Sequence, residues 1–317
     1  MTDEHYQGYD TTMTANTATL DELNQRFGMT DQLRFTDQAD GAIVAAIKNS
    51  RASAQIALQG AQMLAYQPLG AAPVLWTSAA ARWVPGKSLR GGVPVCWPWF
   101  GPHPDDPAQP AHGYARGQNW EVRSSSAMPQ ATHLVLGLPA RPDYQRYAPY
   151  AANLDVELAV SVGAQLHMTL TTRNTGADSV PLTQALHTYF RVSDIGGVRI
   201  LGLEDHVFID KVAGGRATQR GTVQIDGEVD RIYVDTDNDC LIDDAGLQRR
   251  IRIAHTGSRA TVVWNPWIAK SQQLGDMDAE GYRQMLCVET ANAADDARQL
   301  APGATQVLSA VISLEAR

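Results

Sequence analysis

Short hydrophobic runs recur from about residue 40 to the C-terminus, and most follow a two-residue period rather than a helical one. Residues 166–171 (Leu-His-Met-Thr-Leu-Thr) alternate apolar and polar side chains, as in a strand with one buried and one exposed face. Strands are predicted on this basis at residues 41–47, 52–58, 62–66, 132–138, 154–162, 165–173, 249–254, 260–264, 285–289 and 306–314.

Turn residues separate these runs, for example at 174–176 (Asn-Thr-Gly) and 226–227 (Asp-Gly). A short helix is expected at 20–27, with Thr19 as its N-cap, and helical periodicity nearly vanishes after it. Many strands in succession without long helices predict an all-β fold, and their number indicates a large sandwich.

The domain organisation follows from length and local composition. Residues 1–19 are rich in Thr, Asp and Asn and are expected to form a flexible tail. No Pro/Ser-rich linker or internal repeat divides the rest, so residues 20–317 are predicted to form one sandwich domain.

The charge balance limits the classes of partner. With 34 acidic and 26 basic side chains the net charge is −8, which argues against nucleic acids and anionic membranes as ligands. A small anion can still bind where a few arginines gather. The chain starts without a signal-peptide pattern, contains no long apolar span and has three scattered cysteines, so we expect a cytoplasmic protein.

Several common cofactor and catalytic motifs are absent from the sequence. It contains no GxGxxG, GxxxxGK[ST], HExxH or GxSxG pattern, and its eight histidines lack short ligand-like spacing. We therefore expect no cofactor and no metal, although a metal site assembled from distant strands is left open.

Two glycine-containing segments carry candidate binding residues. In 89–101 Arg90 precedes two glycines, a pattern that lets the backbone approach a ligand closely, while Trp97, Trp99 and Phe100 offer flat apolar surface for a sugar ring. The alternative for this segment is a core strand stiffened by Pro and Trp. The second segment, 111–120, places a His and an Arg around a glycine, or is an ordinary charged loop.

Two further segments carry candidate acid–base residues. Along 182–190 the alternation puts His187 on one strand face with Ala185 and Tyr189; the alternative is a hydrogen-bonded core histidine. Glu289 stands at the end of an apolar strand, where desolvation would raise the pKa of its carboxyl toward that of a general base. The alternative is a structural glutamate capping a loop.

Six segments in order resemble the hexose-6-phosphate mutarotases, the glucose-6-phosphate 1-epimerases within the aldose 1-epimerase group. The resemblance implies a galactose-mutarotase-like β-supersandwich of mostly antiparallel strands with few short helices, in agreement with the strand pattern. The six segments are 90–101, 112–120, 185–190, 228–233, 263–266 and 287–291.

The same resemblance implies roles for individual residues. The catalytic acid falls on His187 and the catalytic base on Glu289, and the substrate-binding arginines fall on Arg90 and Arg116. The remaining substrate-binding positions fall on His112 and Asp230. One departure is Ala111, where some members carry a Gln that contacts the substrate.

The implied reaction exchanges the α and β anomers of a hexose 6-phosphate, most simply glucose 6-phosphate. Ring opening needs one proton removed from the C1 hydroxyl and one delivered to the ring oxygen, so a base and an acid on opposite sides of C1 suffice. We expect the two arginines to clamp the phosphate, Asp230 to hold sugar hydroxyls and His112 to donate to the ring or its substituents. The expected partner is this small substrate, bound by a monomer.

Three other functions remain open on the sequence. A mutarotase for free sugars would share the acid and the base but would not direct the arginines to a phosphate. A non-catalytic carbohydrate-binding module would use Trp97, Trp99 and Trp264 as a platform, and a regulator of metabolic enzymes would keep only the fold.

Overall fold

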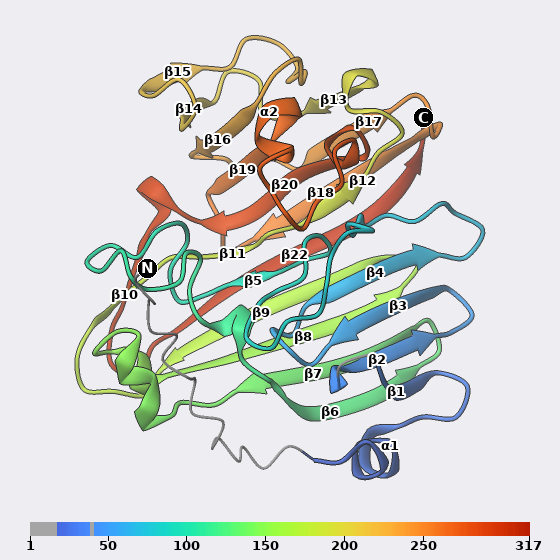
Figure 1. Ribbon diagram of the computed structural model, residues 1–317, viewed down its shortest axis with the longest axis vertical. Helices are drawn as coiled ribbons and strands as arrows, with labels where there is room; N and C mark the ends of the chain where they lie inside the picture. Colours follow the sequence, from blue (N-terminus) through green and yellow to red (C-terminus); the bar gives the residue numbers. More distant parts are fainter. Residues whose placement is uncertain (1–17, 39–40) are drawn as a thin grey trace, which may run out of the picture.

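The computed structural model describes residues 18–38 and 41–317, and its strand pairs are antiparallel (Figure 1). One eight-stranded sheet has the order β13-β17-β18-β22-β9-β8-β7-β6. Its strands are β6 (Glu121–Met128), β7 (Ala131–Leu138), β8 (Leu154–Gly163), β9 (Leu166–Asn174), β13 (Val198–Leu201), β17 (Cys240–Asp244), β18 (Arg249–Thr256) and β22 (Thr305–Ala316).

A second eight-stranded sheet has the order β15-β14-β16-β19-β20-β11-β5, and β12 also pairs with β20. This sheet carries the residues that become important below. Its strands are β5 (Val95–Cys96), β11 (Gln184–Leu186), β12 (Tyr189–Arg191), β14 (Val207–Asp210), β15 (Arg216–Thr218), β16 (Val229–Val234), β19 (Ala260–Asn265) and β20 (Met285–Asn292).

Smaller elements complete the described chain. A four-stranded sheet joins β1 (Leu33–Asp37), β2 (Ile43–Lys48), β3 (Ala52–Ala57) and β4 (Met63–Pro68), and a two-stranded sheet joins β10 (Val180–Leu182) to β21 (Arg298–Leu300). Helix α1 (Leu20–Phe27) packs beside β1 and β6, whereas α2 (Trp267–Ser271) follows β19 at the other end of the molecule (Figure 1).

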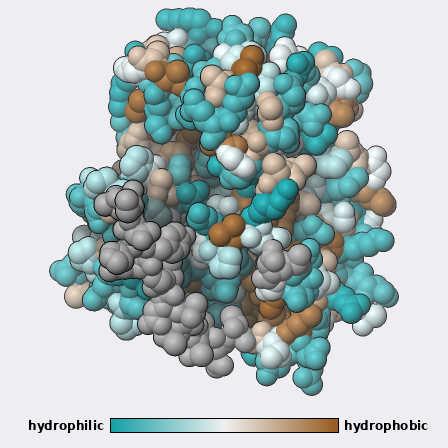
Figure 2. Space-filling view, viewed as in Figure 1, coloured by the Kyte–Doolittle hydropathy of each residue, from teal (hydrophilic) through white to brown (hydrophobic). Residues whose placement is uncertain are grey.

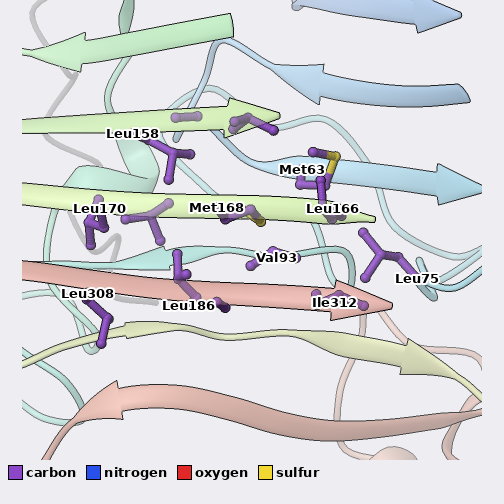
Figure 3. Close-up of a cluster of buried hydrophobic side chains, with 14 of the residues drawn as sticks. Met63, Leu75, Val93, Leu158, Leu166, Met168, Leu170, Leu186, Leu308 and Ile312 are labelled. Atoms are coloured by element: carbon purple, nitrogen blue, oxygen red, sulfur yellow. The ribbon is translucent and has the colours of Figure 1, made fainter. Parts of the chain in front are cut away.

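The main hydrophobic core gathers side chains from several sheets. In Figure 3, Met63 of β4, Leu158 of β8, Leu170 of β9, Leu186 of β11 and Leu308 of β22 belong to one buried cluster. Strand β20 is buried along all eight of its residues, because it is central in its sheet and covered on both faces. A polar side chain on β20 is therefore withdrawn from water wherever it points.

The predicted elements are confirmed with small shifts at their ends. Each predicted strand range overlaps an observed strand, and the predicted helix matches α1, where Thr19 and Glu22 form a capping box. The prediction was wrong for residues 182–190, which are not one continuous strand: β11 ends at Leu186 and β12 begins at Tyr189. The backbone N–H of His187 in this break donates to Pro94 O instead of to a strand partner.

The division into a tail and one domain stays a prediction, and residues 1–17 of that tail lie outside the described residues. Figure 2 shows a largely hydrophilic face on which apolar residues are scattered. Within the described ranges, no helix has the length and apolar character needed to cross a membrane.

Candidate active site

A pocket of about 440 Å³ opens beside the second eight-stranded sheet, and four of the predicted site residues line it. These four are Arg90, His112, Arg116 and His187. They come from three separate stretches of the chain, so the fold, not local sequence, brings them together.

His187 and Glu289 are in direct contact beneath this pocket. Nε2 of His187 lies 3.4 Å from Oε1 of Glu289. Glu289 is only 1% exposed and lies in the interior of β20, not at the end of a strand as the sequence pattern suggested, because β20 continues to Asn292. Among the described residues, Oε2 of Glu289 and Nδ1 of His187 are buried without a hydrogen-bond partner, which is unusual for buried polar atoms and is expected where a ligand completes the bonding.

Burial shifts the two pKa values in opposite directions. Desolvation and then the charge of Asp230 raise the pKa of Glu289 well above its usual value, with Lys211 opposing them. Desolvation, followed by the charges of His112, Arg116 and Arg90, lowers the pKa of His187 well below its usual value. Burial therefore favours the uncharged forms of both side chains, with the proton of the pair on Glu289 and not on His187.

Replacing Glu289 with Gln is expected to stabilise the protein increasingly as the pH rises. The unfolded chain releases the Glu289 proton near pH 4.5, but the folded protein keeps it to a higher pH. The folded state then binds more protons than the unfolded state, so wild-type stability falls as the pH rises through that window, by roughly 1.4 kcal/mol per pH unit. Urea unfolding of Glu289→Gln and wild type at several pH values measures this growing difference.

The matched control is Glu280→Gln, because the Glu280 side chain is 72% exposed. Its difference from wild type is expected to stay constant over the same pH range. A pH-independent difference for Glu289→Gln would contradict the raised pKa.

Tyr189 is a further member of the site that the sequence reasoning placed only as a neighbour of His187. Its ring stacks on the His187 ring, with centroids 4.9 Å apart and planes at 11°. The predicted sharing of one face by these two residues therefore holds despite the break in the strand. The signal for Tyr189 was its two-residue spacing from His187.

Arg90 is held by two side chains at one end of the pocket. Its Nε donates to Oδ1 of Asp276 at 3.0 Å, and its Nη1 donates to the hydroxyl of Tyr189 at 3.2 Å. Nη2 of Arg90 has no hydrogen bond to the described residues and remains available. Asp276 was missed by the sequence reasoning, since it stands 186 residues from Arg90 in a segment without a recognisable motif.

The two glycines after Arg90 approach the protein's own backbone, not a ligand, which corrects the prediction made for them. At Gly92, with φ of +63°, an added Cβ would lie 2.0 Å from Met63 O. A side chain there would clash and would strain the backbone. Gly92 thus packs the Arg90 segment against β4, and Gly91 packs it against the backbone of Trp76 and Thr77, which together fix the position of the Arg90 backbone.

His112 is a neutral hydrogen-bond donor facing the pocket. The backbone N–H of Gly101 donates to Nδ1 of His112 at 3.3 Å, which leaves the ring proton on Nε2. Desolvation, followed by the charges of Arg116, Lys211 and Arg90, lowers the pKa of His112 to about 3. The ring therefore stays neutral at physiological pH.

Arg116 is anchored through a backbone group of residue 111. Its Nη2 donates to the carbonyl oxygen of Ala111 at 2.7 Å. Any residue at position 111 can supply that carbonyl, so Ala111 supports Arg116 even though it lacks the Gln side chain of some family members.

Asp230 lies on the same face of the sheet but does not line the pocket. Cα register pairs Asp230 with Trp264, Trp264 with Cys287, and Cys287 with Tyr189, so the four form one row across β16, β19, β20 and β12. Oδ2 of Asp230 lies 3.6 Å from Nζ of Lys211. The charge of Asp230 contributes to the raised pKa of Glu289.

Two of the three tryptophans considered as a sugar platform are core residues. Trp97 is 0% exposed and donates from Nε1 to Thr172 Oγ1, and Trp99 is buried and donates to Pro110 O. The alternative interpretation of a stiffened core segment is therefore correct for both. Trp264 is partly exposed, and its ring meets those of His187 and Tyr189 edge-on.

One group in the described part of the chain has metal-ligand geometry. Ligand atoms of His187, Cys287 and Glu289 all lie within 4.8 Å of one another. Burial, followed by the charge of Glu289, raises the pKa of Cys287 well above its usual value, so the thiol keeps its proton and is a poor ligand. The group is better suited to moving a proton between His187 and Glu289 than to holding a cation.

Comparisons with known proteins identify the family of the chain. The family described as aldose 1-epimerase matches residues 44–313. Relatives from Escherichia coli K12 and Salmonella typhimurium are 35% and 34% identical over 264 and 255 residues, which cover 83% and 80% of this chain and 86% and 84% of theirs. Both carry the name "Putative glucose-6-phosphate 1-epimerase".

Solved structures give the same result for the fold. A crystal structure described as a "putative mutarotase (YeaD) from Salmonella typhimurium" has a TM-score of 0.85 at 32% identity and covers 92% of this chain and 96% of its own. Galactose 1-epimerase from Lactobacillus acidophilus, at 14% identity, shares the fold with a TM-score of 0.68 over 90% of this chain and 99% of its own. These structures confirm the predicted galactose-mutarotase-like fold. From the match over residues 44–313 and these relatives, the chain belongs to the aldose 1-epimerase family.

Proposed function

We propose that this member of the aldose 1-epimerase family is an isomerase that interconverts the α and β anomers of a hexose 6-phosphate, with glucose 6-phosphate as the preferred substrate. The observation that carries the proposal is the buried His187–Glu289 contact at the floor of a pocket lined by arginines. The names of the Escherichia coli and Salmonella relatives support the choice of substrate.

Glu289 is the proposed base and His187 the proposed acid. Glu289 takes the proton of the C1 hydroxyl while protonated His187 supplies one to the ring oxygen, and the C1–O5 bond opens to the aldehyde. Rotation about the C1–C2 bond then exposes the other face of the aldehyde. Ring closure reverses the two proton transfers and gives the other anomer.

The contact geometry changes one expectation about this pair. The two side chains lie 3.4 Å apart and touch, instead of standing apart on opposite sides of C1. The ring oxygen and the C1 hydroxyl are bonded to the same carbon, so a closely spaced acid and base suit them. The direct contact also offers a path by which a proton moves from Glu289 to His187 before ring opening.

Arg90 and Arg116 are the proposed phosphate ligands. Nη2 of Arg90 has no described protein partner, and Arg116 commits only its own Nη2, to Ala111 O. Guanidinium donors match the geometry of phosphate oxygens. Asp230 is proposed to hold sugar hydroxyls, and His112, with its proton on Nε2, to donate to the ring or its substituents.

Exchange spectroscopy by NMR tests the proposal directly. Wild-type protein added to equilibrated glucose 6-phosphate is expected to speed exchange between its anomeric signals, and to speed exchange of glucose far less at the same enzyme concentration. Equal acceleration of both sugars would favour a free-sugar mutarotase. Binding without acceleration of either sugar would favour a carbohydrate-binding protein and overturn the proposal.

We also propose that the enzyme acts as a monomer in the cytoplasm. Sedimentation measurements of the purified protein test the monomer.

A further inference from the structure

Lys87 lines the same pocket as Arg90 and Arg116, although no motif pointed to it. Its side chain is exposed and forms no ion pair with any acid in the described ranges. Most other cations around the site are already engaged: Arg90 pairs with Asp276, and Lys211 pairs with Asp230.

The turn that carries Lys87 is held in place by hydrogen bonds. The Lys87 N–H donates to Val84 O at 3.0 Å, which closes the turn. Nε2 of Gln59 donates to Val84 O and to Lys87 O, while the Gly86 N–H donates to Oε1 of the same Gln59. These hydrogen bonds fix the position of the Lys87 Cα beside the pocket, while the Lys87 side chain stays mobile.

The same interactions bring Lys87 beside Arg116. An added Cβ at Gly117 would lie 2.4 Å from Gly86 O, so the segments that carry Arg116 and Lys87 are packed backbone to backbone. The Gly60 N–H, next to Gln59, donates to Gln118 O at 2.7 Å. One turn at residues 59–60 thus connects both cation-bearing segments.

The charge balance of the pocket favours a dianion. Its lining holds three cationic side chains, Lys87, Arg90 and Arg116, and a single carboxylate, Asp276, which is paired with Arg90. Two positive charges are left over in a chain whose net charge is −8. A phosphate monoester carries about −1.5 to −2 at pH 7 and would neutralise them.

We propose that Lys87 is a third phosphate-binding residue, which together with Arg116 selects hexose 6-phosphates over free hexoses. This inference rests on the proposed function and names a residue that determines its specificity. Lys87 supplies a mobile ammonium group that follows the phosphate, while the arginines supply oriented donors. A free sugar has no phosphate for this cation to bind, so the Lys87 ammonium group stays solvated.

The test measures KM and kcat for glucose 6-phosphate with Lys87→Gln. We expect KM to rise about ten-fold, as for the loss of one charge-assisted hydrogen bond, with kcat nearly unchanged because the acid–base pair is untouched. Inorganic phosphate should inhibit the variant about ten-fold more weakly than it inhibits wild type. Any exchange of free glucose should proceed at the wild-type rate.

Two variants serve as controls. Lys87→Arg keeps the positive charge and is expected to keep a KM close to that of wild type. Lys48→Gln removes an exposed lysine that does not line the pocket and is expected to change nothing.

The outcomes separate this inference from the proposed function. Wild-type activity on glucose 6-phosphate with an unchanged KM and unchanged phosphate inhibition in Lys87→Gln would overturn the role of Lys87 and leave the proposed function standing. A wild-type protein that does not speed anomer exchange of glucose 6-phosphate would overturn both. A higher KM for phosphorylated and free sugar alike would show that Lys87 shapes the pocket without selecting phosphate, which also overturns the inference.

Discussion

Replacing Glu289 with Gln is expected to lower kcat for anomer exchange of glucose 6-phosphate by about 10²–10⁴-fold. A positioned proton-transfer group contributes this much to a rate, and an amide cannot accept the C1 hydroxyl proton. The substitution is nearly isosteric, so KM should change little. Exchange spectroscopy measures the loss above the uncatalysed background, and His187→Ala is expected to lose a similar factor.

The double variant sharpens this prediction. If His187 and Glu289 act as one unit, removing both costs little more than removing either, because the surviving partner cannot complete the proton transfers alone. Multiplicative losses in the double variant would mean that the two side chains act independently. Wild-type activity in folded Glu289→Gln would exclude Glu289 as the base.

The same variant is expected to gain stability while it loses activity. The carboxyl of Glu289 is buried with Oε2 unpartnered, which costs folding free energy that an uncharged amide avoids at high pH. A substitution that improves stability and abolishes turnover is the signature of a site kept strained for chemistry. If Glu289→Gln lost activity and was also less stable than wild type at pH 8, the loss of activity would instead reflect general damage to the fold.

Trp97→Ala is expected to lower the free energy of unfolding by about 3–5 kcal/mol. Trp97 is fully buried, and truncating such a side chain loses its transfer free energy and leaves a cavity. Its indole N–H also donates to Thr172 Oγ1, which in turn donates to Gln184 Oε1 between the two large sheets. Because total stabilities are about 5–15 kcal/mol, urea unfolding should show a marked shift of the midpoint.

Trp97→Phe provides the comparison, since it keeps most of the apolar volume and loses the indole donor. We expect it to cost distinctly less than Trp97→Ala. If Trp97→Ala left stability unchanged but weakened sugar binding, Trp97 would be a surface platform and not a core residue.

The local parts of the fold could be predicted from the sequence because their causes are local. The alternation at residues 166–171 predicts a strand, and Thr19 as an N-cap predicts the start of the helix at 20–27. The break at His187 could not be predicted in this way. It depends on Pro94, whose carbonyl oxygen accepts the His187 N–H from more than ninety positions away in the chain.

The residues of the candidate site also divide into those that the sequence predicts and those that depend on long-range contacts. The resemblance supplied His187, Glu289, Arg90, Arg116, His112 and Asp230, each from a recognisable segment. Asp276 and Lys87 had no such signal, since Asp276 matters through its contact with Arg90, and Lys87 through the packing of its neighbour Gly86 against Gly117. The sequence predicted that desolvation would raise the pKa of Glu289. It could not predict the contact with His187, because that contact depends on the pairing of β20 with β11 and β12.

The single proton shared by His187 and Glu289 has a consequence for the direction of the reaction. In the proposed cycle, ring opening moves one proton from His187 to the sugar and one from the sugar to Glu289. Ring closure reverses both transfers, so the enzyme ends a turnover in the state in which it began. The free enzyme is then the same species whichever anomer arrives first. Such a catalyst needs no exchange with solvent protons between turnovers, and its rate is expected to be independent of buffer concentration in both directions.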